Sequence, residues 1–313
     1  MKEGIFPQFK FRSEFKDIEK DQYFRMITCA GNYDEELRTL SLNNEASNLL
    51  KYRVFKDFVL LLQKNGLKDF IPLKGMWLFN TLFNEFQGLR TMIDIDILFS
   101  RDEFRKIPAF LKKNPGLYVK TPGSPFLRSF FAEEQSVIVD SILVEMHSDI
   151  TLIKNRGLIK EIFNESSEFE NSDGLKFKVP SIEHGLMLML LHDYSREDLA
   201  DLTVKRLLEF YIVLYNCDMK KVLETANRHG LSKMLDCHLF MLYAMMEEPF
   251  FERSSFKVHE AFGCIERPAG SNKFTVSSPG KLCKILYGRK WYLLKMRNLA
   301  ASVFKVLFLK NPK

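Results

Sequence analysis

Two aspartates, two positions apart, interrupt an apolar run in the first third of the chain. Asp94 and Asp96 alternate with isoleucines in Ile93-Asp94-Ile95-Asp96-Ile97-Leu98-Phe99. This alternation predicts a strand over residues 93–99, with the isoleucines, Ile93 included, in the core and both carboxylates on the opposite face. Two parallel carboxylates repel each other unless a cation lies between them, and a hard ion such as Mg²⁺ prefers oxygen ligands. The alternative is an exposed strand face with two hydrated acids.

Glu145 and His147 repeat this spacing in Val144-Glu145-Met146-His147. If their strand lies beside the first, Glu145 meets Asp94 and Asp96, and three carboxylates surround one or two ions. Two such ions hold the attacking and leaving oxygens in phosphoryl or nucleotidyl transfer. His147 is then either a hydrogen-bonded structural histidine or a contact to a phosphate.

Lys74 and Gly75 lie where an apolar run, residues 70–73, meets a short predicted helix over residues 76–83. Glycine lets a phosphate approach the backbone, a helix N-terminus favours negative charge, and Lys74 adds a positive one. Arg90, just before the acidic strand, either reaches a phosphate or is a surface arginine. The spacing of His184 and His192 suits no shared metal, so we expect both, and His238, to be core or surface residues.

The elements that must position these residues can be predicted from local patterns. Helical apolar spacing predicts a helix over residues 52–62 that ends at Asn65-Gly66. Residues 137–150 read as a strand broken near Asp140-Ser141. Ser100 and Glu103 have the spacing of a capping box, and Ser181 suits the first position of a later helix.

The order of these patterns predicts five segments along the chain. A helical segment over 1–67 precedes an α/β core over 68–153, and polar residues over 154–180 indicate a linker. Residues 181–267 have helical patterns and predict a helical domain. Residues 268–313 form a basic tail.

Composition narrows the class of protein. The chain has 313 residues, 46% hydrophobic and 27% charged, which is typical of a folded globular protein. Its apolar runs are too short for a membrane span, and its five cysteines form no CxxC pair, which argues against a disulfide framework or a structural zinc site. We therefore expect a cytoplasmic protein without a transmembrane segment.

The net charge of +6 is concentrated at the C-terminal end. Residues 268–313 contain ten Lys or Arg and no Asp or Glu, so residues 1–267 carry 6 − 10 = −4. Basic and apolar residues together suggest an amphipathic helix that contacts an anionic membrane surface or a nucleic acid. The alternative is a final helix that packs on the body of the protein and leaves its lysines in water.

Three blocks, in order, carry a resemblance: Leu73-Lys74-Gly75, then Arg90 to Leu98, then Val144-Glu145-Met146-His147. Over residues 50–215 they resemble the uncharacterised nucleotidyltransferase family of the DNA polymerase β-like superfamily. The resemblance implies an α+β fold, with a small mixed β-sheet flanked by helices and followed by a helical bundle. It also implies that Asp94, Asp96 and Glu145 bind two Mg²⁺ or Mn²⁺ ions and that Lys74 and Gly75 occupy a phosphate-binding turn. The wider superfamily usually has Gly-Ser or Gly-Gly in that turn, whereas Met76 and Trp77 follow Gly75 here.

These features favour an enzyme that moves a nucleoside monophosphate from a nucleoside triphosphate to an acceptor hydroxyl and releases pyrophosphate. Two alternatives remain open. The first is a catalytically degenerate module of the same fold that binds a nucleotide or a partner, and the second is a toxin-like transferase that modifies RNA or protein. A sugar phosphate, an antibiotic, a protein side chain and an RNA end are all acceptors consistent with the sequence.

Overall fold

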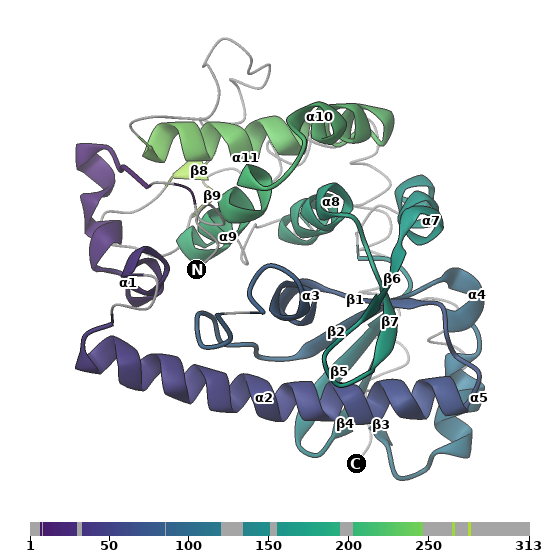
Figure 1. Ribbon diagram of the computed structural model, residues 1–313. Helices are drawn as coiled ribbons and strands as arrows, with labels where there is room; N and C mark the ends of the chain where they lie inside the picture. Colours follow the sequence, from purple (N-terminus) through teal and green to yellow (C-terminus); the bar gives the residue numbers. More distant parts are fainter. Residues whose placement is uncertain are drawn as a thin grey trace, which may run out of the picture.

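The computed structural model describes residues 7, 9–29, 33–84, 86–119, 134–150, 155–194, 203–246, 265–266 and 275–276. In this part of the chain five strands form one mixed sheet, flanked by helices (Figure 1). The order across the sheet is β1 (Phe70–Pro72), β2 (Ile95–Phe99), β5 (Ile142–His147), β4 (Glu134–Val139) and β3 (Tyr118–Val119). β2 and β5 are parallel, whereas β1–β2, β4–β5 and β3–β4 are antiparallel. The predicted α+β class with a small mixed sheet is therefore confirmed.

β4 and β5 form a hairpin that closes at Asp140-Ser141. These two residues have φ of 47° and 66°, and Val139 pairs with Ile142 directly across the turn. A two-residue hairpin loop with positive φ at both positions matches the right-handed twist of its strands, and Asp tolerates that conformation better than most residues. The predicted break in residues 137–150 is confirmed.

β2 lies inside the sheet, between β1 and β5, and all five of its residues are buried. The strand begins at Ile95, so the prediction that Ile93 enters the core is wrong: its side chain is 85% exposed. The chain bends at Asp94, and the segment before it is held by side chains of another helix, described below, and not by the sheet. Asp96 is only 2% exposed, so the acidic face of the strand is not solvent-exposed.

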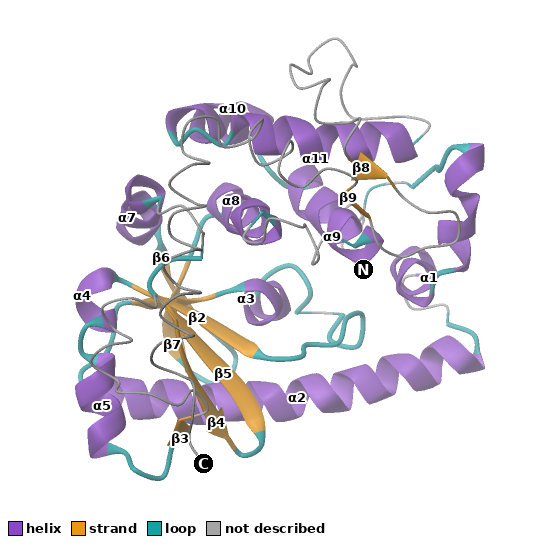
Figure 2. Cartoon of the chain, turned by 180° about the vertical axis from the view of Figure 1, so that it is seen from behind, coloured by secondary structure: helices purple, strands orange, loops and turns teal. Residues whose placement is uncertain are grey.

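The long helix α2 (Glu35–Lys64) crosses the lower part of the sheet, in front of it in Figure 1 and behind it in Figure 2. It begins where the Asp34 carboxylate accepts a hydrogen bond from the backbone N–H of Leu37, an arrangement that satisfies a free donor of the first turn. It ends at Lys64, and Gly66 follows with φ of 79°. The predicted end at Asn65-Gly66 is confirmed, and the helix extends further toward the N-terminus than residues 52–62.

The other helices lie beside and above the sheet (Figure 2). They are a 3₁₀ helix η1 (Ser13–Lys20), α1 (Gln22–Cys29), α3 (Lys74–Asn80), α4 (Arg101–Phe104), α5 (Ile107–Lys113), α7 (Arg156–Glu165), α8 (Ile182–Asp193), α9 (Val204–Tyr215), α10 (Met219–Arg228) and α11 (Ser232–Met245). Ser181 caps α8 by accepting from the N–H of His184, as predicted. Ser100 makes no side-chain cap at α4, so the predicted capping box with Glu103 is wrong. Glu103 pairs with Lys106 instead.

Residues 155–180 contain regular elements where the sequence suggested a linker. They form α7 and a hairpin of β6 (Ser167–Glu170) and β7 (Lys176–Val179). Leu158 and Ile162 are fully buried, because α7 turns its apolar face inward. They belong to one cluster of buried apolar side chains that extends from α2 through the sheet to α11. The five segment boundaries stay predictions.

The described part of residues 268–313 is Thr275–Val276 (β9), which pairs with Ile265–Glu266 (β8). The predicted amphipathic tail otherwise lies outside the described residues, as do its predicted contacts. Among the helices that the structure describes, none combines the length and the apolar character that crossing a bilayer requires.

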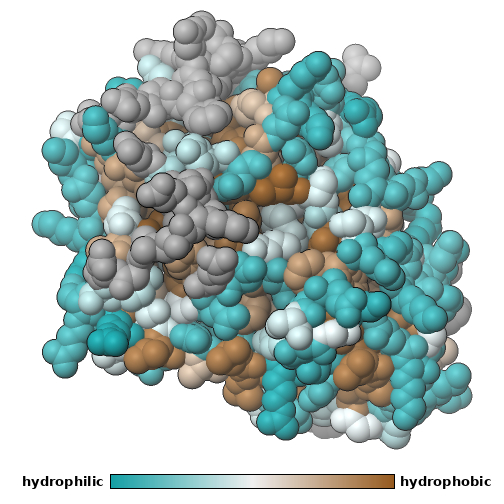
Figure 3. All heavy atoms as spheres, in the orientation of Figure 1, coloured by the Kyte–Doolittle hydropathy of each residue, from teal (hydrophilic) through white to brown (hydrophobic). Residues whose placement is uncertain are grey.

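Hydrophilic side chains dominate the face shown in Figure 3. Apolar side chains on this face lie in separate places along its lower edge, where α2 runs. The exposed large apolar residues of that helix are Leu42, Leu49, Leu50 and Leu60. Small separate apolar areas are normal on protein surfaces and do not indicate a binding site. The candidate functional residues are therefore among the polar side chains.

Candidate active site

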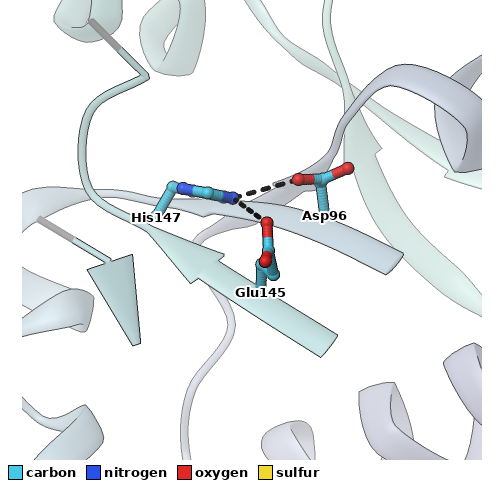
Figure 4. Close-up of side chains that lie close together, drawn as sticks. All are labelled: Asp96, Glu145 and His147. Carbon is cyan, nitrogen blue, oxygen red and sulfur yellow. Dashed lines mark hydrogen bonds and ion pairs between the residues drawn. The ribbon is translucent and has the colours of Figure 1, made fainter. Parts of the chain in front are cut away.

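The parallel pairing of β2 and β5 brings together the two polar segments that the sequence singles out. Asp96 lies opposite Glu145, and Leu98 lies opposite His147. The Nε2 atom of His147 is 3.1 Å from Oδ1 of Asp96 and 3.8 Å from Oε2 of Glu145 (Figure 4). One ligand atom from each of the three residues lies within 4.8 Å of the other two. The strands therefore gather two carboxylates and an imidazole, which we call the β2–β5 cluster.

Lys74 reaches the cluster from the first position of α3. Its Nζ atom is 2.8 Å from Oδ1 of Asp96, and the backbone N–H of Leu73 donates to the carbonyl oxygen of Asp96 at 2.9 Å. Lys74 has φ of +46°, a left-handed conformation that costs a non-glycine residue on the order of 1 kcal/mol. The ion pair and the neighbouring backbone bond hold the residue in that conformation, so the turn is fixed to β2.

Asp96 is ionised despite its burial. Burial alone raises the pKa of a carboxyl group, but the hydrogen bond from His147 and the charge of Lys74 outweigh it and hold the pKa of Asp96 well below its usual range. Since an ionised carboxylate only accepts hydrogen bonds, Nε2 of His147 is the donor. The cluster thus contains a buried negative charge.

Glu145 has a weaker partner, because Nε2 of His147 is 3.8 Å from its Oε2 and lies closer to Asp96. Burial raises its pKa first, and the negative charges of Glu134 and Asp96 add to this, so the pKa of Glu145 rises to about 7. The cluster therefore holds more negative charge than its own cations neutralise. A bound cation would relieve this repulsion.

Asp94 lies beside the cluster and not inside it. It precedes β2, is half-buried, and does not belong to the set of ligand atoms within 4.8 Å of one another. Burial and the charge of Asp96 raise the pKa of Asp94. The two aspartates therefore interact electrostatically, although they do not share one strand face as the alternation suggested.

Gly75, at the start of α3, lies against the segment before β2, which contains Arg90. A Cβ atom on Gly75 would lie 2.8 Å from Cγ of Met92 and 3.3 Å from Nη1 of Arg90, so a side chain here would force this segment away. Nε of Arg90 lies 3.0 Å from Oε1 of Glu209 on α9. The structure thus places Arg90 in an ion pair with the helical part of the chain and not among the carboxylates.

Asn44 and Asn48 of α2 position the segment that leads to Asp94, and the sequence analysis missed both. The side-chain amide of Asn48 donates to the backbone oxygens of Gln87 (2.7 Å) and Arg90 (2.5 Å), and its oxygen accepts from the N–H of Met92 at 2.9 Å. Asn44 donates to the Gly88 oxygen at 3.1 Å. Two asparagines four positions apart lie on one face of a helix, and this spacing was the sequence pattern that could have predicted a shared polar contact.

A second buried polar centre lies in the helical part of the chain. Oδ1 of Asp193 is 2.7 Å from Nη1 of Arg206, and Oδ2 is 3.0 Å from Nε2 of His238. Nδ1 of His192 also faces Nη1 of Arg206. We call these four residues the Asp193 network. The sequence analysis assigned His192 and His238 to core or surface positions because their partners are distant in the chain.

Glu161, Glu165 and His184 form another group of potential ligands within 4.8 Å. Glu161 already pairs with Arg228 at 2.7 Å and with His229 at 2.8 Å. These hydrogen bonds outweigh the effect of burial and lower the pKa of Glu161. Its charge is thus compensated, unlike that of the β2–β5 cluster.

The fold and the cluster together define a class of protein: an α+β protein in which two neighbouring strands direct acidic side chains to one point, with a lysine from a strand–helix turn beside them. The chain belongs to the uncharacterised nucleotidyltransferase family, whose family model matches residues 28–247. This match includes the β2–β5 cluster, Lys74 and α8. No curated protein matches the chain.

Proposed function

We propose that this protein is a metal-dependent nucleotidyltransferase that transfers a nucleoside monophosphate from a nucleoside triphosphate to an acceptor hydroxyl. In this reaction the acceptor oxygen forms a bond to the α-phosphorus, and the bond from that phosphorus to the oxygen bridging to the β-phosphate breaks. Pyrophosphate leaves with the bonding electron pair, and the proton of the hydroxyl passes to water. The observation that carries the proposal is the convergence of the Asp96 and Glu145 carboxylates from two neighbouring strands, with ligand atoms within 4.8 Å of each other.

The residues present fit a divalent metal. Asp96 and Glu145 supply carboxylate oxygens within 4.8 Å of each other, and Asp94 adds a third carboxylate nearby. Hard cations such as Mg²⁺ or Mn²⁺ prefer oxygen ligands. When bound, a pair of such ions acts as a Lewis acid on the attacking and leaving oxygens. We assign Asp94, Asp96 and Glu145 to metal binding.

The remaining residues position the substrate and the carboxylates. Lys74 lies at the edge of the cluster, where its Nζ atom contacts Asp96. From this position its positive charge neutralises negative charge on the leaving phosphates. Gly75 keeps the turn close to the segment before β2. His147 orients the carboxylate of Asp96 by its hydrogen bond. We assign Arg90 to positioning, because its ion pair with Glu209 holds the segment that leads to Asp94.

Pyrophosphate release tests this function. The full-length protein is incubated with each of the four nucleoside triphosphates, Mg²⁺ or Mn²⁺, and a cell extract as the source of acceptors. We expect release with at least one triphosphate, and a loss of at least roughly 10²-fold in turnover for Asp96→Asn, because a buried charge that stabilises the transition state is removed. Asp102→Asn, whose side chain is 88% exposed on α4, is the matched control. Equal turnover of Asp96→Asn and the wild type would contradict the assignment.

One observation favours a second candidate, a catalytically degenerate nucleotide-binding module. The residues after Gly75 in the turn, Met76 and Trp77, are 1% and 3% exposed, so they pack in the core and offer no hydroxyl to a triphosphate. Calorimetry distinguishes the two candidates. A degenerate binder takes up nucleotide without Mg²⁺ and releases no pyrophosphate, whereas the enzyme requires the metal.

A further inference from the structure

α3 and α8 are in direct contact beside the β2–β5 cluster. A Cβ atom on Gly185 of α8 would lie 2.1 Å from the ring of Trp77 on α3, so the indole occupies the space that glycine leaves open. His192 follows Gly185 by seven positions, which places both on the same side of α8 two turns apart. Lys74 precedes Trp77 by about one turn of α3. His192 and Lys74 both line the recess beside this contact.

Lys74, Trp77 and His192 line one recess between these helices, together with Leu188 and Gly185. Burial lowers the pKa of His192, the Asp193 carboxylate opposes this, and the charges of Lys74 and Arg206 lower the pKa further. A positive charge on His192 would in turn lower the pKa of Asp94. His192 therefore lies within electrostatic range of both Lys74 and Asp94, although it belongs to the helical part of the chain.

The Asp193 network fixes the tautomer of His192. Nδ1 of His192 faces Nη1 of Arg206, and a guanidinium group can only donate hydrogen bonds. Oδ1 of Asp193 is 3.9 Å from Nδ1, beyond hydrogen-bond distance, so Nδ1 accepts from Arg206 and the proton of the neutral ring resides on Nε2. Arg206 is itself held by the buried carboxylate of Asp193 at 2.7 Å. The ring thus presents an N–H donor on the side away from Arg206.

We propose that His192 is a further substrate-contacting residue of the site, whose Nε2–H donates a hydrogen bond to the leaving pyrophosphate beside Lys74. This inference rests on the nucleotidyl transfer proposed above. Arg206 and Asp193 are positioning residues in this arrangement, since they act on the substrate only through the imidazole. The helical part of the chain thereby contributes a residue to a site built mainly on the sheet.

Binding of inorganic pyrophosphate tests the assignment. The affinity of the full-length protein for pyrophosphate in the presence of Mg²⁺ is measured by calorimetry, and its affinity for Mn²⁺ by electron paramagnetic resonance. His192→Leu should weaken pyrophosphate binding about tenfold, the worth of one hydrogen bond to a charged group, and should leave Mn²⁺ binding unchanged. His192→Gln keeps an N–H donor close to the position of Nε2 and should bind pyrophosphate within about twofold of the wild type. His229→Gln, at a histidine paired with Glu161, is the matched control.

The outcomes separate this inference from the proposed function. If His192→Leu binds pyrophosphate as the wild type does, or if His192→Gln fails to restore binding, His192 contacts no phosphate and the assignment is overturned. If His192→Leu weakens the binding of pyrophosphate and Mn²⁺ alike, its role is structural, which also overturns the assignment. If the wild type binds neither Mn²⁺ nor pyrophosphate, the proposed function fails and the assignment fails with it.

Discussion

Two carboxylates of this protein are equally buried and differ in their surroundings. Asp96 in the sheet and Asp193 at the end of α8 are each 2% exposed. Each lies close to a cation and a histidine: Asp96 to Lys74 (2.8 Å) and His147 (3.1 Å), and Asp193 to Arg206 (2.7 Å) and His238 (3.0 Å). In both cases the surrounding donors and positive charges outweigh burial and hold the pKa well below its usual range, and at Asp193 the neighbouring His192 contributes together with His238 and Arg206.

Asp96 and Asp193 differ in the charged groups that lie beyond their direct partners. The two groups that contact the Asp193 carboxylate directly, Arg206 and His238, both donate to it, so its charge is matched. Around Asp96 they include two more acids, and the pKa values of both Glu145 and Asp94 are raised by burial and by negative neighbours. Burial of a charge therefore does not identify a functional site. An unmatched excess of one sign of charge is the feature that distinguishes the β2–β5 cluster, because folding alone gives no reason to keep it.

Removing the charge of Asp193 gives the largest effect on stability. Asp193→Asn removes the buried carboxylate that pairs with the half-buried Arg206 and with His238, so we expect the free energy of unfolding to fall by about 3 kcal/mol. Because the folded-state pKa of Asp193 is depressed, its contribution is present above the unfolded pKa of about 4 and is lost as the pH falls further. Urea denaturation at neutral pH measures the change, with Asp102→Asn as the control.

Asp96→Asn sharpens the comparison when its stability is measured in the same way. Its charge is also paired, but its removal relieves repulsion with Glu145 and Asp94, so the loss of stability should be clearly smaller than for Asp193→Asn. Equal losses for the two variants would show that the two centres do not differ in charge balance.

A divalent cation should affect the stability of the two variants, Asp96→Asn and Asp193→Asn, differently. Mg²⁺ at about 100 times its dissociation constant should raise the free energy of unfolding of the wild type by roughly 2.7 kcal/mol, because it binds the folded state alone. Asp193→Asn, although less stable, should keep this increase, whereas Asp96→Asn should lose it. Thermal denaturation with and without Mg²⁺ gives the measurement, and an increase that survives in Asp96→Asn would place the metal elsewhere.

The parts of this architecture that were predicted from sequence depend on local pattern. The hairpin turn at Asp140-Ser141 and the end of α2 at Asn65-Gly66 follow from the conformations that these residues tolerate. The convergence of Asp96 with Glu145 followed from alternation on two strands and from the assumption that they are neighbours.

The features that escaped prediction depend on partners far apart in the chain. Ile93 continues the alternation of β2, yet it is exposed, because Asn48, more than forty positions earlier, holds the preceding segment by its backbone. Arg90 resembles a phosphate ligand in sequence and pairs with Glu209 in the structure. Local spacing carries no information about which distant helix supplies a counter-ion, and this is also why the Asp193 network was missed.

The smallest predicted effect concerns Glu145 and has the opposite sign to that of Asp193→Asn. Burial and its negative neighbours raise the folded-state pKa of Glu145 to about 7, above its unfolded value of 4.5. Below pH 4.5 the carboxyl group of Glu145 is protonated in both the folded and the unfolded state, so it does not lower the free energy of unfolding. As the pH rises toward 7 the unfolded chain ionises more readily, so the folded protein loses stability, and the full cost is present above pH 7.

Glu145→Gln removes this cost, because glutamine is neutral at every pH. Without metal, we expect the variant to be more stable than the wild type by about 1 kcal/mol at pH 8 and equally stable at pH 4. Saturating Mg²⁺ should reverse the order at pH 8, since the wild type gains binding energy that the variant has lost. Urea denaturation at both pH values measures the difference, with the exposed Glu168→Gln on β6 as the control. A variant less stable than the wild type at pH 8 without metal would mean that Glu145 is compensated as fully as Asp193, and that the excess of negative charge in the β2–β5 cluster does not exist.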